Sequence, residues 1–273
     1  MKNILVATDF SDAATNAVTY AALLALEFKA ELTLFNAFKP DVHTANSRSS
    51  SASLGVLKKH NEEHLAELAA HTSALHALPV HWKCVADSPV ERLAEYASQH
   101  PVDLVVMGIE ADLPEYKLFG NTTTAVIKLR KFPVLVVPNG VTLGAMKRVL
   151  YACDPSRLKT GSELALLAAL LSTFGAQLDV LHVFQQDRDE ARRKRVEQVI
   201  ATALPGVTPE FRYLTHQKVD DGIRECVHRY PTGLLAMLSH ELGFWESVTT
   251  GSHTRAMTVT TRVPLLVLPG GAR

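Results

Sequence analysis

The sequence predicts an α/β protein with two doubly wound, five-stranded, mostly parallel sheets that pack as a pseudo-two-fold pair. Short apolar runs alternate with segments of helical period along the whole chain, which is typical of parallel strands joined by crossover helices. The two halves open alike, with Asn3–Asp9 matched by Arg148–Asp154, and each closes on a proline-flanked apolar run, Pro133–Pro138 and Pro264–Pro269. An internal repeat of this kind predicts two copies of one domain.

The repeat also sets the expected domain boundaries. Ala30–Phe38 resembles Ala176–Phe184 in the same register as the opening strands. We therefore expect a first domain over residues 1–138, a linker over 139–147 and a second domain over 148–273. The first copy carries an extra polar stretch, Thr44–Ser53, whose serines are typical of a mobile surface loop.

In the first half, strands and helices are expected to alternate. The first strand ends at Asp9, and Ser11 or Asp12 caps the helix that follows. Val102–Met107 is almost wholly apolar, as a strand covered on both faces should be. The predicted elements, in chain order, are Ile4–Thr8, Ala13–Phe28, Leu32–Ala37, Leu54–Leu78, Val80–Val85, Pro89–His100, Val102–Met107, Thr122–Lys131 and Val134–Val137.

The second half repeats this order. Its predicted strands are Val149–Ala152, Leu178–Phe184, Glu210–Leu214, Leu234–Leu238 and Leu265–Leu268. Its predicted helices are one that ends at Phe174 and three over residues 187–203, 219–230 and 252–261.

The last strand of each half would be an exposed apolar edge in an isolated domain. Such edges invite pairing, and a chain with two copies supplies the partner. We therefore predict that Val134–Val137 and Leu265–Leu268 join the two copies into an intramolecular pseudo-dimer.

Composition excludes several classes of function. Lys plus Arg and Asp plus Glu both total 28 in 273 residues, so there is no net attraction to nucleic acid or to an anionic membrane. No apolar run approaches the roughly 18 residues of a membrane span. Cys84, Cys153 and Cys226 are odd in number and far apart, so neither a disulfide framework nor a zinc site is expected. These features predict a cytoplasmic protein without a bound metal, nucleic acid or membrane.

The candidate ligand site of the first half lies where its central strands end. In open parallel sheets, ligands bind at the carboxyl ends of the strands; here the first strand ends at Asp9 and the fourth at Gly108. Gly120, Asn121 and Thr122 then open a helix, whose free N–H groups suit a phosphate. A plain helix cap explains the same three residues equally well, and the residues alone leave both interpretations open.

Both halves resemble the universal stress protein family, and the resemblance covers nearly the entire chain. The family pattern is a first strand ending in Asp, then Gly-x2-Gly-x9-Gly-Ser/Thr before a last helix and a Pro-Val-Leu-Val-Val strand. The resemblance implies an adenine nucleotide alpha hydrolase-like, Rossmann-like fold and a stress-response protein that binds or senses ATP or AMP. The implied nucleotide contacts are Asp9, Ala37, Gly108, Gly120, Asn121 and Thr122 in the first half, and Asp154, Val183, Gly251 and Ser252 in the second.

The two copies depart from this pattern to different degrees. In the first, Ala111 replaces the second glycine, the spacer is one residue shorter and Asn121 replaces Ser/Thr. In the second, Leu238 and Glu241 replace both leading glycines; a bulky side chain blocks close backbone approach, and a carboxylate repels polyphosphate. We therefore expect a nucleotide in the first copy, with the second crevice plugged by Phe244 and Trp245.

The predicted function is a nucleotide-binding or nucleotide-sensing module with little or no catalysis. The P-loop pattern is absent from the sequence. Two alternatives stay open: a protein-interaction scaffold that binds no nucleotide, and a weak ATPase that uses Glu110, Asp112 or Glu115. An unidentified protein partner and a further homodimer are also expected.

Overall fold

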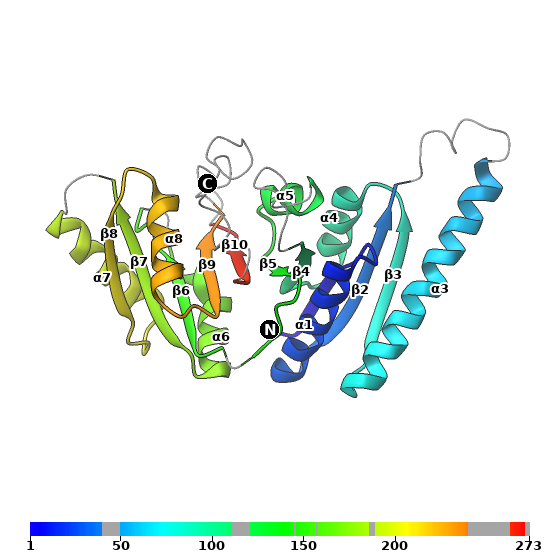
Figure 1. The fold of residues 1–273 in the computed structure, drawn as a ribbon, viewed down its shortest axis with the longest axis horizontal. Helices are drawn as coiled ribbons and strands as arrows, with labels where there is room; N and C mark the ends of the chain where they lie inside the picture. Colours follow the sequence, from blue (N-terminus) through cyan, green and yellow to red (C-terminus); the bar gives the residue numbers. More distant parts are fainter. Residues whose placement is uncertain are drawn as a thin grey trace.

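The computed structural model describes residues 1–39, 50–110, 121–144, 146–156, 158–185, 189–239 and 263–270, with the backbone alone for 50–53 and 121. The described residues form one ten-stranded sheet with helices on both of its faces (Figure 1).

The first half follows the predicted order closely. Ser11 caps the first helix, because its side chain accepts a hydrogen bond from the N–H of Ala14. The long helix begins at Ser50, so the last four residues of the predicted loop Thr44–Ser53 are helical; residues 44–49 lie outside the described residues. The elements are β1 (Asn3–Ala7), α1 (Asp12–Phe28), β2 (Glu31–Phe38), α3 (Ser50–His76), β3 (Val80–Ala86), α4 (Pro89–Gln99), β4 (Leu104–Ile109), α5 (Asn121–Lys128) and β5 (Val134–Pro138).

The second half repeats this order. Its second full helix begins at Glu190 rather than at 187, where the Asp189 side chain caps it by accepting from the N–H of Ala191 at 2.9 Å. The predicted helix 252–261 lies outside the described residues. The elements are β6 (Arg148–Ala152), the 3-10 turn η2 (Ser162–Leu164), α6 (Ala165–Phe174), β7 (Gln177–Phe184), α7 (Glu190–Ala203), β8 (Glu210–Thr215), α8 (Val219–Arg229), β9 (Leu234–Leu238) and β10 (Leu265–Leu268).

The ten strands lie in the order β3-β2-β1-β4-β5-β10-β9-β6-β7-β8. Every neighbouring pair is parallel except β5 and β10, which run antiparallel with Leu135 opposite Leu266. The two last strands thus pair as predicted. The expectation of two separate five-stranded sheets is wrong, because this pairing continues the backbone ladder from one half into the other.

Two hydrophobic cores lie on opposite faces of the sheet, and each contains residues from both halves. One lies beneath α1, α3, α6 and α7 and includes Leu24, Leu65, Leu167 and Val196. The other lies beneath α4, α5 and α8 and includes Leu93, Val126, Ile127 and Ile223. Because each core is shared, the halves are held together by packing as well as by the sheet.

The segment between the halves is anchored to the first half. The Asn16 side chain donates hydrogen bonds to the carbonyl oxygens of Pro138 and Val141, at 3.1 and 3.0 Å. Gly140 turns the chain there with a positive φ of 79°, a conformation that favours glycine. Met146, just before β6, is buried and lies beside Gly233 of the second half, so the end of the predicted linker packs against the domain it enters.

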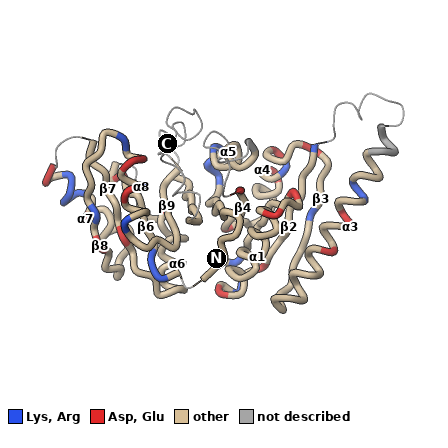
Figure 2. The backbone as a smooth tube through the Cα atoms, viewed as in Figure 1, with Lys and Arg blue, Asp and Glu red and all other residues tan. Residues whose placement is uncertain are grey.

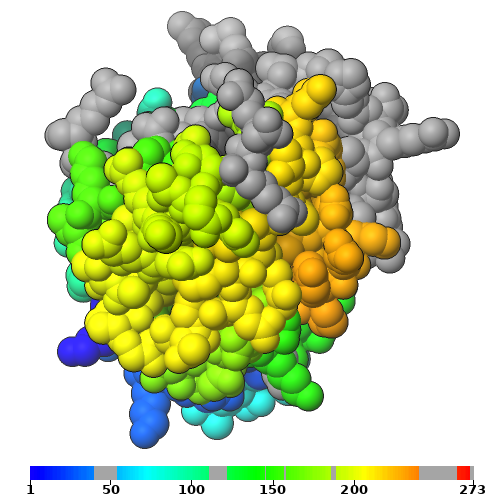
Figure 3. Space-filling view, turned by 90° about the vertical axis from the view of Figure 1, so that its left-hand side faces the viewer, coloured from blue at the N-terminus to red at the C-terminus, as the bar shows by residue number. Residues whose placement is uncertain are grey.

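The charged residues are distributed as the equal totals of basic and acidic residues in the sequence predict. Basic and acidic residues are intermixed over both halves (Figure 2), and none of the described helices is long and apolar enough to cross a membrane. Cys84, Cys153 and Cys226 are buried, and burial raises the pKa of the Cys226 thiol to about 12. The sheet ends at β3 and β8; Figure 3 faces the β8 end, where α7 and β8 form the surface.

Candidate ligand-binding sites

Two cavities open at the carboxyl ends of the strands, one in each half. The first, here the N-terminal crevice, has a volume of about 330 Å³ and lies between the ends of β1, β2 and β4 and the start of α5. The second, here the C-terminal crevice, has a volume of about 460 Å³ and lies at the ends of β6 and β7, between α7 and α8. Both positions are those in which open parallel sheets bind ligands.

A tight turn fixes Asp9 at the end of β1. Its Oδ1 accepts hydrogen bonds from the backbone N–H of Ser11 at 3.1 Å and from the Ser11 hydroxyl at 2.6 Å. Between them, Phe10 has a φ of 67°, which is rare for a bulky side chain. The Phe10 ring stacks on the imidazole of His64 in α3, with centroids 4.3 Å apart. The carboxylate of Asp9 is therefore held in one direction at the rim of the crevice.

The second half has the same turn at the corresponding place. Oδ1 of Asp154 accepts from the N–H of Ser156 at 3.0 Å and from its hydroxyl at 2.7 Å. Pro155 occupies the position that Phe10 holds in the first half. The Asp-x-Ser motif thus serves the same structural purpose in both halves, independently of any ligand.

Gly108 has a packing role that the sequence did not reveal. A Cβ atom added there would lie 2.1 Å from the carbonyl oxygen of Ala13 and 2.7 Å from the N–H nitrogen of Ala14. The start of α1 therefore rests directly on the backbone of β4, which only glycine allows. Gly108 also lines the N-terminal crevice, so its position fits both the family pattern and this close helix–strand contact.

The N-terminal crevice brings together several residues of the predicted site. Asp9, Ala37, Gly108 and Thr122 all line it. Asn121 begins α5, but its side chain lies outside what the structure describes, as does Gly120. The rest of the lining is largely apolar, with contributions from Phe35, Pro89, Leu93, Met107 and Ile109.

The described lining of this crevice carries negative charge. Its ionisable members are Asp9 and Glu110, and both are exposed. The amide of Asn139 donates a hydrogen bond to Glu110 Oε2 at 3.2 Å. Asp112 and Glu115, the other predicted acidic residues, lie outside the described part of the chain. This lining favours a flat apolar group over a polyanion.

The C-terminal crevice contains Asp154 and Val183 of the predicted site, while Gly251 and Ser252 lie outside the described residues. Leu238 was expected to obstruct this crevice, but it is fully buried at the end of β9 and is not part of the lining. Glu241, Phe244 and Trp245, the other expected obstructions, also lie outside the described residues.

The sequence reasoning missed His182. In β7, its Nδ1 lies 2.8 Å from the carbonyl oxygen of Cys153. In β2, the side chain of Asn36 donates to the carbonyl oxygen of Thr8, also at 2.8 Å. The repeat aligns Asn36 with His182, so a polar residue at the same place in two matched strands was the available signal.

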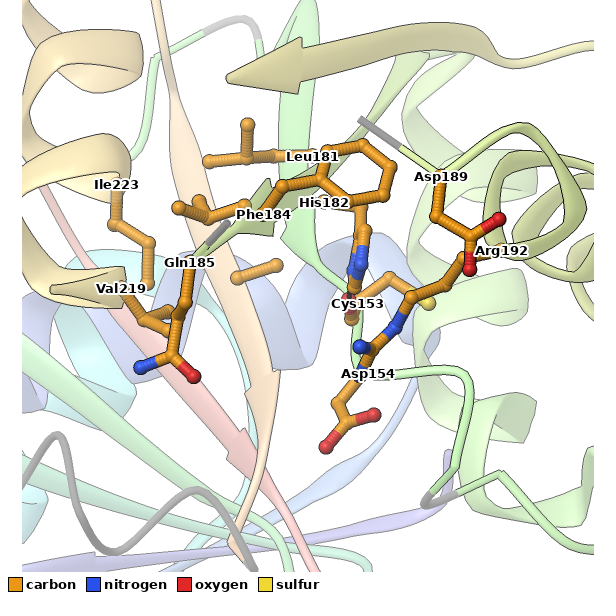
Figure 4. Close-up of a pocket in the computed structure, with 12 residues that line it drawn as sticks. Cys153, Asp154, Leu181, His182, Phe184, Gln185, Asp189, Arg192, Val219 and Ile223 are labelled. Atoms are coloured by element: carbon orange, nitrogen blue, oxygen red, sulfur yellow. Dashed lines mark hydrogen bonds between the residues drawn. The ribbon is translucent and has the colours of Figure 1, made fainter. Parts of the chain in front are cut away.

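His182 lies in the polar part of the C-terminal crevice. Its side chain is 5% exposed, and burial, opposed by the Cys153 carbonyl and aided by the charge of Arg192, lowers its pKa below the usual value. Arg192 comes from α7, Asp189 caps the N-terminus of that helix and Asp154 follows β6 (Figure 4). Among the described residues, no cluster of three or more His, Cys, Asp or Glu could hold a metal ion.

Comparisons with known proteins agree with this architecture. A model of the universal stress protein family matches residues 1–138, and no curated protein matches the chain. A universal stress protein from Archaeoglobus fulgidus is similar over 98% of both chains, with a TM-score of 0.76 and 16% identity. A protein of unknown function from Pseudomonas aeruginosa matches over 99% of this chain and 93% of its own, with a TM-score of 0.62 and 14% identity. Both share the fold across the two halves.

One further solved structure is a universal stress protein in complex with cAMP. It aligns with 51% of this chain and 98% of its own length, at 24% identity and a TM-score of 0.40.

Proposed function

Because the chain belongs to the universal stress protein family, we propose that it is a stress-response protein that binds an adenine nucleotide in its N-terminal half, with no strong catalytic activity. The observation that carries the proposal is the N-terminal crevice, where Asp9, Ala37, Gly108 and Thr122 meet around a cavity of about 330 Å³. Cavities of this size suit small-molecule ligands.

The apolar part of the lining suits the base. Phe35 and Met107 contribute apolar surface from the strands, and Leu93 from α4. A flat heteroaromatic ring gains by leaving water for such surroundings. The backbone at Ala37, at the end of β2, supplies the polar groups that would orient the ring edge.

The polar rim suits a ribose. Oδ1 of Asp9 is already engaged by Ser11, whereas Oδ2 receives no hydrogen bond from any residue that the structure describes. A carboxylate oxygen accepts hydrogen bonds, so Oδ2 would take one from a ribose hydroxyl.

Charge sets the expected order of nucleotides. The start of α5 offers backbone N–H groups to a phosphate, but Asp9 and Glu110 also line the crevice. Each added phosphate increases repulsion from these carboxylates. We therefore expect AMP to bind more tightly than ATP, and the difference to shrink as salt screens the repulsion.

Titration calorimetry of the full chain with AMP and ATP tests the proposal. Asp9→Asn keeps the Oδ1 acceptor for Ser11 but replaces the ribose acceptor Oδ2 with an NH2 donor, and should weaken AMP binding about tenfold or more. Asp154→Asn is the matched control, since it makes the same change in the other half and should leave AMP binding unchanged. Phosphate release from ATP should stay at background.

The absence of both binding heat and a thermal shift with millimolar AMP and ATP would refute the proposal. The protein-interaction scaffold would then be the remaining interpretation.

A further inference from the structure

The turn at Asp9 lines the N-terminal crevice on both sides of a residue that does not. Thr8, Asp9 and Ser11 line the crevice, whereas Phe10 is not part of the lining. The Phe10 ring lies against α3 instead, where it stacks on the imidazole of His64 with centroids 4.3 Å apart and ring planes inclined by 15°. It also packs against the core beneath α1 and α3. The side chain of Phe10 therefore joins the wall of the crevice to α3.

The backbone of Phe10 has a conformation that costs free energy for a residue with a side chain. Its φ is 67°, in the left-handed region, where Cβ crowds the neighbouring carbonyl oxygen. The N–H of Phe10 donates to the Thr8 hydroxyl at 3.1 Å, and the N–H of Ser11 donates to Asp9 at 3.1 Å. These two hydrogen bonds and the contacts of the Phe10 ring hold the turn in this conformation.

The second half shows that the hydrogen bonds between Asp and Ser do not require a left-handed residue. Asp154 and Ser156 form the same two bonds, with Pro155 between them. The proline ring fixes φ at about −65°. Backbone strain persists only where the surroundings hold it, and the surroundings of the Phe10 ring are His64 and the core.

We propose that α3 positions Asp9 for the nucleotide through the stack of His64 on Phe10. His64 is then a positioning residue. It lies outside the lining of the crevice, but by holding the turn it fixes the direction of Oδ2 of Asp9, the oxygen assigned to the ribose. The inference rests on the proposed function, because Asp9 has this task only if the N-terminal crevice binds a nucleotide.

Titration calorimetry of the full chain with AMP tests the role of His64. His64→Ala removes the stacked ring and should weaken AMP binding about three- to tenfold, the loss expected for an aromatic pair. His64→Phe keeps a ring on Phe10 and should bind AMP as the native protein does. His71→Ala is the matched control, because His71 is an exposed histidine of the same helix outside the lining, and it should leave AMP binding unchanged.

Phe10→Gly tests whether the effect of His64 passes through the ring. Glycine adopts a positive φ without strain, so this variant keeps the turn accessible while losing the contact with α3. In the Phe10→Gly background, His64→Ala should change AMP binding by less than about twofold. An equal loss in both backgrounds would show that His64 acts by another route and would overturn the proposal.

Amide hydrogen exchange of the ligand-free protein follows the turn itself. The N–H groups of Phe10 and Ser11 should exchange about three- to tenfold faster in His64→Ala, because the turn opens more often without the stack. In His64→Phe they should exchange at the native rate. Equal exchange in His64→Ala and the native protein would overturn the positioning role even if affinity fell, because the loss would then not come from the turn.

The two proposals fail in different ways. If AMP binds the native protein and His64→Ala equally well, the positioning role is wrong and the nucleotide proposal stands. If neither AMP nor ATP binds the native protein, the proposed function is wrong and the positioning role fails with it.

Discussion

The ring of Phe28, at the end of α1, meets the ring of Phe174, at the end of α6, edge-on with centroids 6.3 Å apart. The two residues occupy corresponding places in the two halves, so the contact is one between equivalent positions, as in a symmetric dimer. Both rings pack against the core that runs beneath α1 and α6.

Replacing either ring should therefore lower the stability of both halves together. We expect Phe174→Ala to lower the free energy of unfolding by about 1–2 kcal/mol, and the coupling to Phe28→Ala to be about 0.5–1.5 kcal/mol in a double-mutant cycle. Urea denaturation measures both quantities. Leu26→Ala, at an exposed position of α1, is the control and should cost less than about 0.5 kcal/mol; additive effects of the two phenylalanine changes would show that the rings are not coupled.

The contact between Gly108 and the start of α1 predicts a stability effect that needs no ligand. Gly108→Ala would force a methyl group against the Ala13 carbonyl and should cost about 1–3 kcal/mol. Gly144→Ala is the control, because nothing lies within 4 Å of its added Cβ, and it should be neutral or slightly stabilising. Thermal unfolding of the ligand-free protein compares them, and similar melting temperatures for the two variants would argue against the contact.

Asp179 joins two arginines within the second half. It is 2% exposed, and its carboxylate lies 3.0 Å from Arg148 and 3.1 Å from Arg212. Asp179→Ala leaves these guanidinium groups without their buried partner and should cost about 3–5 kcal/mol. Glu210→Ala removes a half-exposed carboxylate from the same cluster and should cost less than about 1 kcal/mol.

Chemical denaturation distinguishes the two variants. A loss for Asp179→Ala no larger than that for Glu210→Ala would mean that the buried pairings contribute little.

His182 makes stability depend on pH. Its pKa is lowered in the folded state, chiefly by burial and also by Arg192, against the opposing effects of the Cys153 carbonyl and Asp154. Below the usual histidine pKa of about 6.5, the unfolded chain binds a proton that the folded chain does not. Stability should therefore fall as the pH drops below about 6.5, by at most about 1.4 kcal/mol per pH unit from this group, until the folded-state pKa is reached.

Urea denaturation between neutral and mildly acidic pH measures this slope. His182→Asn keeps the bond to Cys153 and cannot titrate, so its slope should be smaller by the same amount. An unchanged slope would show that His182 takes up its proton equally in both states.

The central strands β1, β4, β5, β9 and β10 were predictable because each is largely a continuous apolar run. The bounds of β9 and β10 agree with the sequence to the residue, and the apolar edges of β5 and β10 indicated their pairing. The merging of two sheets into one was not predictable. Hydrophobicity shows which edge strands are apolar, but it does not show whether hydrogen bonds between their backbones join the two halves into one sheet.

The candidate sites were predictable in position and not in chemistry. The place of Asp9, just after β1, and that of Gly108, near the end of β4, follow from strand order. The contact of Gly108 with Ala13 depends on how closely α1 packs against β4. That packing distance cannot be predicted from the local sequence around either residue. His182 was visible as a polar residue matched to Asn36 by the repeat. Only its contact with Cys153, which follows another strand, shows which ring nitrogen has no partner.

The pairing of β5 with β10 takes place within one polypeptide. Such a contact is unimolecular, so its occupancy does not change with protein concentration, unlike that of a dimer assembled from separate chains. Dilution should leave the two halves associated, and a free single-domain protein should be unable to exchange into this interface. The ratio of one N-terminal crevice to one C-terminal crevice is therefore fixed at synthesis, whatever the abundance of the protein in the cell.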